Sequence, residues 1–201
     1  MSQLPKTMKS LVLRSRSEPP TIEVVPVPQV TVGSAVVRVL SACVVSYTRD
    51  VCDGTRPYPM VLPLVPGTSA IGRVAAVAAD ATKLKPGDLV FIDAVIRSRD
   101  EPTDAFLPGV HSGGSEGSRK LMRDTWRDWT YAEYCRAPLE NLTVLNEQRL
   151  TKELGYSLSE LARIAGLLVP YGGLKDINLQ PGQTVIVAPA TGPVSQHYSD
   201  P

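Results

Sequence analysis

The stretch Pro66-Gly67-Thr68-Ser69-Ala70-Ile71-Gly72-Arg73-Val74 decides how this sequence is interpreted. Two glycines stand five residues apart, and the hydroxyl side chains of Thr68 and Ser69 directly follow the first of them. Taken alone, the pattern is typical of a glycine-punctuated turn that enters a β-strand. Hydroxyl groups are not the nitrogen, sulfur or carboxylate ligands that zinc requires, so Thr68 and Ser69 give the stretch no zinc chemistry.

Composition limits the class of protein. The chain has 201 residues, of which 43% are hydrophobic and 20% charged, with a formal net charge of +1. These values are typical of a globular chain of one domain, or of one domain and part of another. A net charge this small provides no positive field that would attract nucleic acid. The longest apolar stretches, such as Ala165–Val169, are far too short to span a bilayer. We therefore expect a cytoplasmic protein with neither a nucleic-acid nor a membrane partner.

The three cysteines, Cys43, Cys52 and Cys135, are odd in number and show no CxxC spacing. A chain of this length does not need disulfides to be stable, so we expect free thiols. Cys43 and Cys135 lie in apolar contexts and are expected in the core.

The first half of the chain reads as β-structure. Short β-branched runs are separated by Pro, Gly and polar clusters, a pattern that predicts a barrel or sandwich. The expected strands are Met8–Val12, Ile22–Val27, Ala35–Ala42, Ile71–Val77, Leu89–Ala94, Trp129–Tyr134 and Leu142–Leu145. A short helical turn is expected at Ser46–Val51, and the polar stretch Arg97–Asp128, which has no sustained period, is expected to be a long surface loop.

The pattern changes after about residue 150. Ser157 and Glu160 have capping-box spacing, which predicts a helix that begins there and ends before Pro170. A turn at Gln180–Gln183 then leads into Thr184–Ala188, an apolar run suited to a strand covered on both faces. The change indicates that a second, α/β domain starts here.

Several of these segments, taken in order, resemble the medium-chain dehydrogenase/reductase superfamily, which includes zinc alcohol dehydrogenases and zinc-less quinone reductases. The resemblance rests on the opening stretch, Lys85–Phe91, the Trp129–Tyr134 run with its Tyr-Ala-Glu-Tyr order, and Gln180–Gly192. It implies a mainly β GroES-like barrel at residues 1–150. The incomplete start of an α/β Rossmann domain would follow at residues 151–201.

The resemblance also assigns roles. Ser46-Tyr47-Thr48 matches a family segment in which a cysteine binds zinc and a hydroxyl relays a proton. Thr48 is thus a candidate catalytic relay, although its hydroxyl could equally be satisfied by its own backbone. Ser46 and Tyr47 are candidate cofactor-binding residues, with a packed aromatic as the alternative reading of Tyr47.

No zinc is expected. The resemblance places the family's catalytic zinc ligands at Ser46 and in the opening stretch, where serine and threonine stand instead. It places the structural-zinc lobe at Arg97–Asp128, which contains no cysteine. His111 and His197, the only histidines, are expected to be solvated surface residues.

Ala190-Thr191-Gly192 matches the turn in which the family binds a dinucleotide pyrophosphate, and it implies NADP(H) as the cofactor of a full-length form. The nine residues Pro193–Pro201 leave no room for the rest of that domain, so we expect a truncated member.

Two functions remain open. One is a zinc-independent oxidoreductase of the alcohol dehydrogenase, enoyl reductase or quinone reductase type, acting on a small-molecule substrate. The other is an inactive truncated fragment or a GroES-like binding module. The sequence leaves the substrate and the oligomeric state open.

Overall fold

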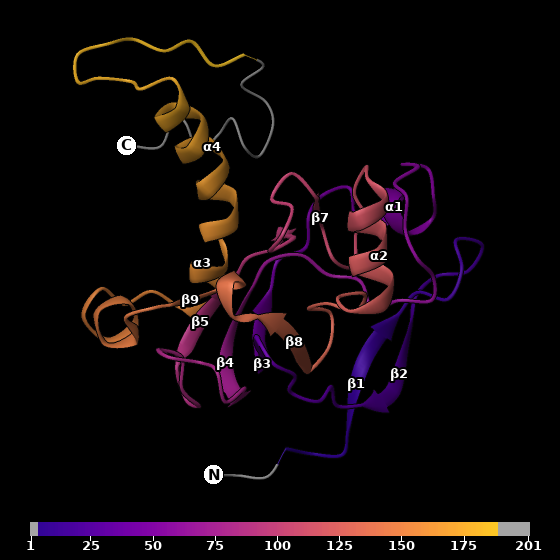
Figure 1. The fold of residues 1–201 in the computed structure, drawn as a ribbon. Helices are drawn as coiled ribbons and strands as arrows, with labels where there is room; N and C mark the ends of the chain where they lie inside the picture. Colours follow the sequence, from indigo (N-terminus) through magenta and orange to yellow (C-terminus); the bar gives the residue numbers. More distant parts are fainter. Residues whose placement is uncertain (1–3, 189–201) are drawn as a thin grey trace.

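Five antiparallel strands form the main sheet in the order β8-β3-β4-β5-β9 (Figure 1). The structure is a computed structural model that describes residues 4–188. The strands of this sheet are β3 (Ser34–Ala42), β4 (Ala70–Val77), β5 (Leu89–Ile92), β8 (Tyr134–Pro138) and β9 (Leu142–Val144). Strands were expected at the places of β3, β4, β5 and β9, and the mainly β fold is confirmed.

Two shorter pairs complete the β-structure. Strands β1 (Thr7–Val12) and β2 (Thr21–Pro26) form an antiparallel hairpin, and β6 (Ile96–Arg97) pairs with β7 (Ala105–Phe106). A bridge between Ser10 and Ala132 joins β1 to the residues just before β8. The hairpin thereby continues the main sheet around the core.

The opening stretch enters β4, and both of its glycines are required there. Gly67 has a φ of +154°, and an added Cβ would lie 2.5 Å from the backbone nitrogen of Thr130. At Gly72, an added Cβ would collide with the side chain of Val37 and come within 2.8 Å of the Arg38 carbonyl on β3. The glycine spacing therefore follows from close approach of neighbouring backbones.

The strand expected at Trp129–Tyr134 is wrong in its bounds, because β8 begins only at Tyr134. The backbone before it is shared between two partners. Leu11 donates to the Tyr131 carbonyl at 2.8 Å, whereas Tyr131 donates to the Pro66 carbonyl at 3.0 Å. Pairing with β1 on one side and with an irregular segment on the other does not produce a continuous ladder.

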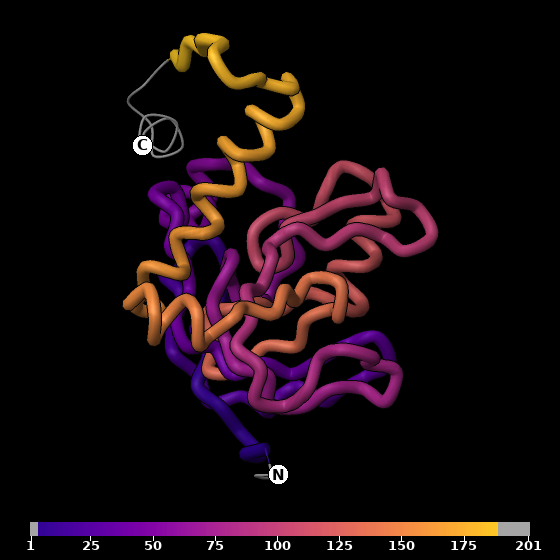
Figure 2. Tube along the Cα trace, turned by 90° about the vertical axis from the view of Figure 1, so that its left-hand side faces the viewer, coloured from indigo at the N-terminus to yellow at the C-terminus, as the bar shows by residue number. Residues whose placement is uncertain are grey.

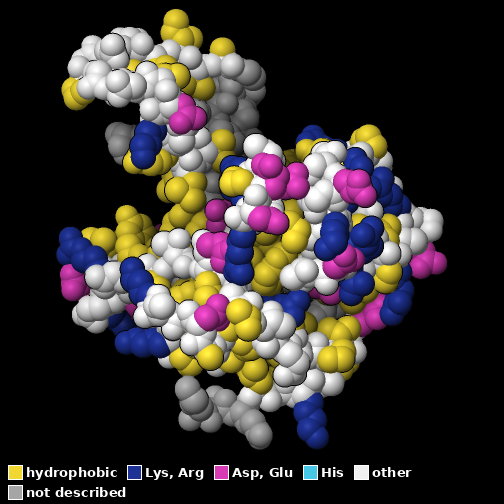
Figure 3. All heavy atoms as spheres, in the orientation of Figure 1, with side chains coloured by type: hydrophobic (Ala, Val, Ile, Leu, Met, Phe, Trp, Pro, Cys, Tyr) yellow, Lys and Arg dark blue, Asp and Glu magenta, His cyan; other side chains and the backbone are white. Residues whose placement is uncertain are grey.

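The stretch Arg97–Asp128 is more structured than the expected loop. It contains β7 and the helix α2 (Glu116–Asp124), which Ser115 caps through a capping box with Ser118. The sequence pattern did not predict α2, because the helix is short and mostly polar. Lys and Arg side chains gather over it in the space-filling view (Figure 3).

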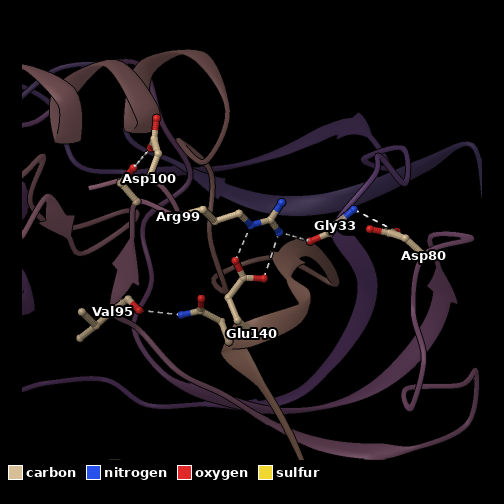
Figure 4. A network of polar contacts seen from close by, with 8 residues as sticks. Gly33, Asp80, Val95, Arg99, Asp100 and Glu140 are labelled. Carbon is tan, nitrogen blue, oxygen red and sulfur yellow. Dashed lines mark hydrogen bonds and ion pairs between the residues drawn. The ribbon is translucent and has the colours of Figure 1, made fainter. Parts of the chain in front are cut away.

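Arg99 anchors the start of this stretch (Figure 4). Its guanidinium forms two hydrogen bonds with the carboxylate of Glu140, at 2.6 and 3.0 Å, and a third with the carbonyl of Gly33 at 3.0 Å. Asn141 donates to the Val95 carbonyl at 2.7 Å. These contacts fasten the stretch to the main sheet at one end.

The helices before α4 are short. Besides α2, the helical segments are α1 (Thr48–Cys52), the 3-10 turn η1 (Leu139–Asn141), the π-helical turn η2 (Gln148–Glu153), α3 (Leu158–Ala162) and α4 (Ile164–Asp176). The capping box of Ser157 and Glu160 is present at α3, as predicted. The expected end before Pro170 is wrong, because α4 continues to Asp176. A proline removes one helical hydrogen bond without forcing the helix to stop.

Helix α3 packs on the sheet, whereas α4 rises away from it (Figure 2). Leu161 and Ala162 of α3 form a buried cluster with Ile71, Leu89 and Phe91. The larger core lies on the other side of the main sheet and includes Trp129, Val37, Val90 and Ile92.

The expected strand at Thr184–Ala188 is also wrong. The turn before it forms, with Gln183 donating to the Gln180 carbonyl at 3.1 Å, but residues 184–188 are irregular. No described strand lies beside them to complete a ladder.

All three cysteines are free thiols; Cys52 and Cys135 are buried and Cys43 is half-buried. Within residues 4–188, no helix is long and apolar enough to cross a membrane.

Candidate functional site

The hydroxyl side chains of Thr48, Thr68 and Tyr131 line one small hollow, and those of Thr68 and Tyr131 both bond to the carbonyl oxygen of Cys43; we call the three the hydroxyl cluster. That carbonyl accepts a hydrogen bond from Thr68 Oγ1 at 2.5 Å and another from Tyr131 Oη at 2.9 Å. All three side chains line a small hollow between α1 and the opening stretch, which has a volume of about 10 Å³. Such a hollow has room for about one water molecule.

Thr48 is the predicted relay residue, and its hydroxyl donates to the Val45 carbonyl at 2.7 Å. This contact is the alternative that the sequence left open for Thr48, in which its hydroxyl is satisfied by the nearby backbone. The oxygen keeps its lone pairs free to accept a proton from a neighbouring hydroxyl.

Tyr131 is the acidic group of the cluster. Burial raises the pKa of its phenol, and hydrogen bonding with Thr48 and Thr68 opposes that shift. The phenol is therefore protonated at neutral pH, so the cluster presents a proton donor rather than an anion.

The two other predicted residues of this segment lie at different positions. Ser46 is exposed and does not line the hollow, whereas Tyr47 lines it next to Thr48. The guanidinium of Arg56 lies 4.3 Å from the centroid of the Tyr47 ring. Arg56 is exposed and forms no ion pair among the described residues. A cation and a phenol thus stand together at the edge of the hollow.

The residues present do not fit a zinc ion. Thr68, at the position of one family ligand, is committed to backbone hydrogen bonds, and Ser69 is buried. In the part of the chain that the structure describes, no group of three or more His, Cys, Asp or Glu side chains could hold a metal ion. A catalytic zinc site needs three such ligands.

The predicted pyrophosphate turn, Ala190-Thr191-Gly192, lies outside the described residues, as does His197. His111 is half-buried rather than fully solvated as expected. Its ring packs 4.9 Å from that of Tyr58, and its Nδ1 accepts a hydrogen bond from the Gly113 backbone at 2.9 Å. Burial lowers the pKa of His111, which keeps the imidazole neutral.

Sequence reasoning missed Tyr131 and Arg56 as members of this site. The pattern of Trp129–Tyr134 indicates only a strand at Tyr131, whereas its hydroxyl reaches Cys43 across 88 residues of sequence. Its position in the Tyr-Ala-Glu-Tyr segment was the one available signal. Nothing in the local pattern around Arg56 indicates that it lies over Tyr47.

Comparison with known proteins agrees with this architecture. The model of the alcohol dehydrogenase GroES-like domain matches residues 28–147. An alcohol dehydrogenase of Rhizobium meliloti (strain 1021) is 28% identical over 90% of this chain and 51% of its own length. The chain thus spans about half the length of this curated relative.

Two solved structures share the fold. A candidate alcohol dehydrogenase from Sinorhizobium meliloti 1021 superposes with a TM-score of 0.72 at 24% identity, covering 96% of this chain and 54% of that one. A short chain alcohol dehydrogenase of Escherichia coli CFT073, solved with NADH, gives a TM-score of 0.66 at 18% identity, covering 90% and 48%. The family model covers more than half of the sequence, and the chain belongs to the family of proteins with an alcohol dehydrogenase GroES-like domain.

Proposed function

We propose that this chain is the proton-handling half of an oxidoreductase that transfers hydride between NADP(H) and a small carbonyl, alkene or alcohol without zinc. The observation that supports the proposal is the hydroxyl cluster, in which Tyr131, Thr48 and Thr68 meet where the family places zinc chemistry. Reduction of a carbonyl needs a hydride on carbon and a proton on oxygen, and the cofactor would supply the hydride.

The proton step falls to this chain. The protonated phenol of Tyr131 has a proton to give, and Thr48, which lines the same hollow, would relay it by accepting that proton while its own turns from the Val45 carbonyl to the substrate oxygen. Loss of the proton leaves a phenolate beside the Thr68 hydroxyl, which can turn its hydrogen bond from the Cys43 carbonyl to the phenolate. Orientation of the substrate against these hydroxyls would replace the Lewis acidity of a metal.

Arg56 and Tyr47 fit the phosphates of a dinucleotide. The guanidinium of Arg56 has no carboxylate partner among the described residues, and it lies over the ring of Tyr47, which lines the hollow together with Thr48. Arginine binds phosphate oxygens through paired donors, so these two residues would position the cofactor close to the hydroxyl cluster. Ser46 and the Ala190-Thr191-Gly192 turn are proposed to contribute further backbone or hydroxyl contacts.

The domain boundary near residue 150 is part of the same proposal. Residues 1–150 would supply the substrate side of the site, and the residues from 151 onward would begin the cofactor domain. Since the relatives are about twice as long, the whole-protein activity is tested on a longer chain.

The test compares the 201-residue chain with a version extended to the length of the relatives by downstream coding sequence or by the cofactor domain of the R. meliloti protein. Both are titrated with NADPH and assayed for its oxidation with aldehydes, quinones and enoyl thioesters, and both are analysed for zinc. We expect the extended version to oxidise NADPH without stoichiometric zinc. Nucleotide binding without turnover of any substrate would favour the alternative, a GroES-like binding module.

A further inference from the structure

A second and larger hollow lies between the β1–β2 hairpin and the residues that follow α2. Its volume is about 650 Å³, and it shares no lining residue with the hollow of the hydroxyl cluster. Pockets for small molecules have volumes of about 300–1,000 Å³. The β1–β2 hairpin stands on the right-hand side of Figure 1, away from α3 and α4. We call it the hairpin hollow.

The inner part of the hairpin hollow is apolar. Met8 and Val12 from β1, Val65, Trp129 and Cys135 are all buried and line it. A hydrocarbon or aromatic body placed on these side chains would lose water-exposed surface, which is the main source of affinity for a small ligand.

Its rim is charged, and one arginine there has no carboxylate partner. Arg14 pairs with Glu23 at 2.6 Å, Arg123 with Asp124 at 3.0 Å and Arg127 with Asp128 at 3.0 Å. Arg136 forms no ion pair among the described residues. Its guanidinium donates to the Thr125 carbonyl at 2.7 Å and lies 5.2 Å from the centroid of the Trp126 ring.

The environment of Arg136 favours an anion. The side chain is partly desolvated, and this burial lowers its pKa; the charge of Asp128 opposes that shift without cancelling it, so the protein still penalises the charge of Arg136. Four arginines and three carboxylates line the hollow, so it carries one excess positive charge. One negative charge on a ligand would balance it, whereas a phosphate dianion would face the three carboxylates of the rim.

Trp129 contributes to the apolar wall of the hollow. The residue is 1% exposed, and its indole Nε1 is buried without any hydrogen-bond partner in the described part of the chain. Because that nitrogen has almost no accessible surface, Trp129 offers a ligand apolar ring atoms rather than a hydrogen-bond donor.

We propose that the hairpin hollow binds a small monocarboxylate with an aromatic or branched aliphatic body, with the carboxylate at Arg136 and the body against Trp129, Met8 and Val12. This site is separate from the hydroxyl cluster and does not depend on the function proposed for it.

Of the two tryptophans of the chain, Trp129 lines the hollow and Trp126 lies against the guanidinium of Arg136, which makes the test direct. The 15N-labelled protein is titrated with phenylacetate, and the two indole N–H signals are followed by NMR; a Trp126→Phe variant assigns them. We expect the Trp129 signal to shift with a dissociation constant of about 1 mM or tighter. Neutral phenylacetamide should shift it much less.

Arg136→Gln should weaken phenylacetate binding by about tenfold or more, because it removes the charge that pairs with the carboxylate. Arg119→Gln is the matched control, since Arg119 is an exposed arginine of α2 that does not line the hollow. Equal responses to phenylacetate and phenylacetamide, stronger binding of inorganic phosphate, or unchanged affinity in Arg136→Gln would each overturn the proposal. If Arg136→Gln does not fold, the comparison of acid with amide on the unmodified chain decides.

Discussion

Thr68 and Thr130 exchange hydrogen bonds in both directions across 62 residues of sequence. The backbone N–H of Thr68 donates to Thr130 Oγ1 at 3.1 Å, and that hydroxyl donates to the Thr68 carbonyl at 2.7 Å. Thr130 is 1% exposed, so one side chain satisfies two backbone groups where water has little access. The pair fixes the hydroxyl cluster, because Thr68 is itself a member of the cluster and Tyr131 directly follows Thr130 in the chain.

Thr130→Val should therefore destabilise the protein by about 1–3 kcal/mol, since it leaves the Thr68 N–H and carbonyl unpaired while keeping the side-chain volume. Urea unfolding followed by circular dichroism measures the loss. Thr143→Val on β9 is the control, because Thr143 is exposed, and it should change the free energy of unfolding by less than about 0.5 kcal/mol. Equal stability of the two variants would show that the Thr68–Thr130 hydrogen bonds do not stabilise the protein.

Gly67→Ala tests the opening stretch. The substitution places a Cβ 2.5 Å from Thr130 at a φ of +154°, so backbone must shift. We expect a loss of at least about 2 kcal/mol, from strain and from disturbance of the same hydrogen bonds. Gly114→Ala is the matched control, since nothing lies within 4 Å of its added Cβ. A Gly67→Ala variant as stable as Gly114→Ala would contradict the packing described here.

Much of the β-architecture follows from the sequence because it depends on local signals. Alternating β-branched runs and Pro-Gly turns such as Lys85–Asp88 act over a few residues, and the structure has strands where they predict them. The predictions fail where the structure depends on hydrogen bonds between residues that are distant in the sequence. The backbone around Tyr131 divides its hydrogen bonds between Leu11 and Pro66, and no periodicity within Trp129–Tyr134 reports that division.

The candidate site was predictable only in part for the same reason. The resemblance located Thr48 and Tyr47, which do lie at one hollow. It gave no hint that Tyr131 joins them or that Arg56 covers Tyr47, because both relations depend on how loops from different strands meet. The unpaired indole of Trp129 is likewise a property of packing, not of sequence.

Thr48→Ala in a full-length version should lower kcat by about 10²-fold or more while changing the dissociation constant of NADPH little, as expected of a group that transfers a proton. Thr48→Ser keeps a hydroxyl and should retain most of the activity. Steady-state kinetics and nucleotide titration measure the two quantities. An unchanged kcat would take Thr48 out of the mechanism.

Glu140→Gln should change how stability depends on pH. The hydrogen bonds from Arg99 hold the pKa of Glu140 below its usual range, with burial opposing. Because the folded pKa is lowered, the pair stabilises the protein above the unfolded pKa of about 4.3, and this contribution is lost as pH falls through the folded value.

The pair is about half exposed, so the difference between wild type and Glu140→Gln at pH 7 should be below about 1 kcal/mol. It should shrink as pH falls below about 4.3 and vanish below the folded pKa of Glu140, as measured by urea titrations. Glu18→Gln, on an exposed residue without an ion pair in the described chain, should follow the wild type throughout. A difference that stays constant with pH would show that Arg99 does not act through the charge of Glu140.

Amide hydrogen exchange should divide the C-terminal helices at about residue 163. Leu161 of α3 is 4% exposed and packs on the sheet, and the Ser157–Glu160 capping box fixes its first turn. Most of α4, by contrast, exposes its apolar side chains, with Val169 57% exposed, and Pro170 removes one hydrogen bond from its middle. Local opening is easiest where few apolar contacts are buried, so amides of residues 171–176 should exchange at least about 100-fold faster than those of β3 and β4.

Ser157→Ala, which removes the cap at a cost of about 1 kcal/mol, should speed exchange in α3 and leave β3 unchanged. Slow exchange through the whole of α4 would mean that its exposed face is covered in solution.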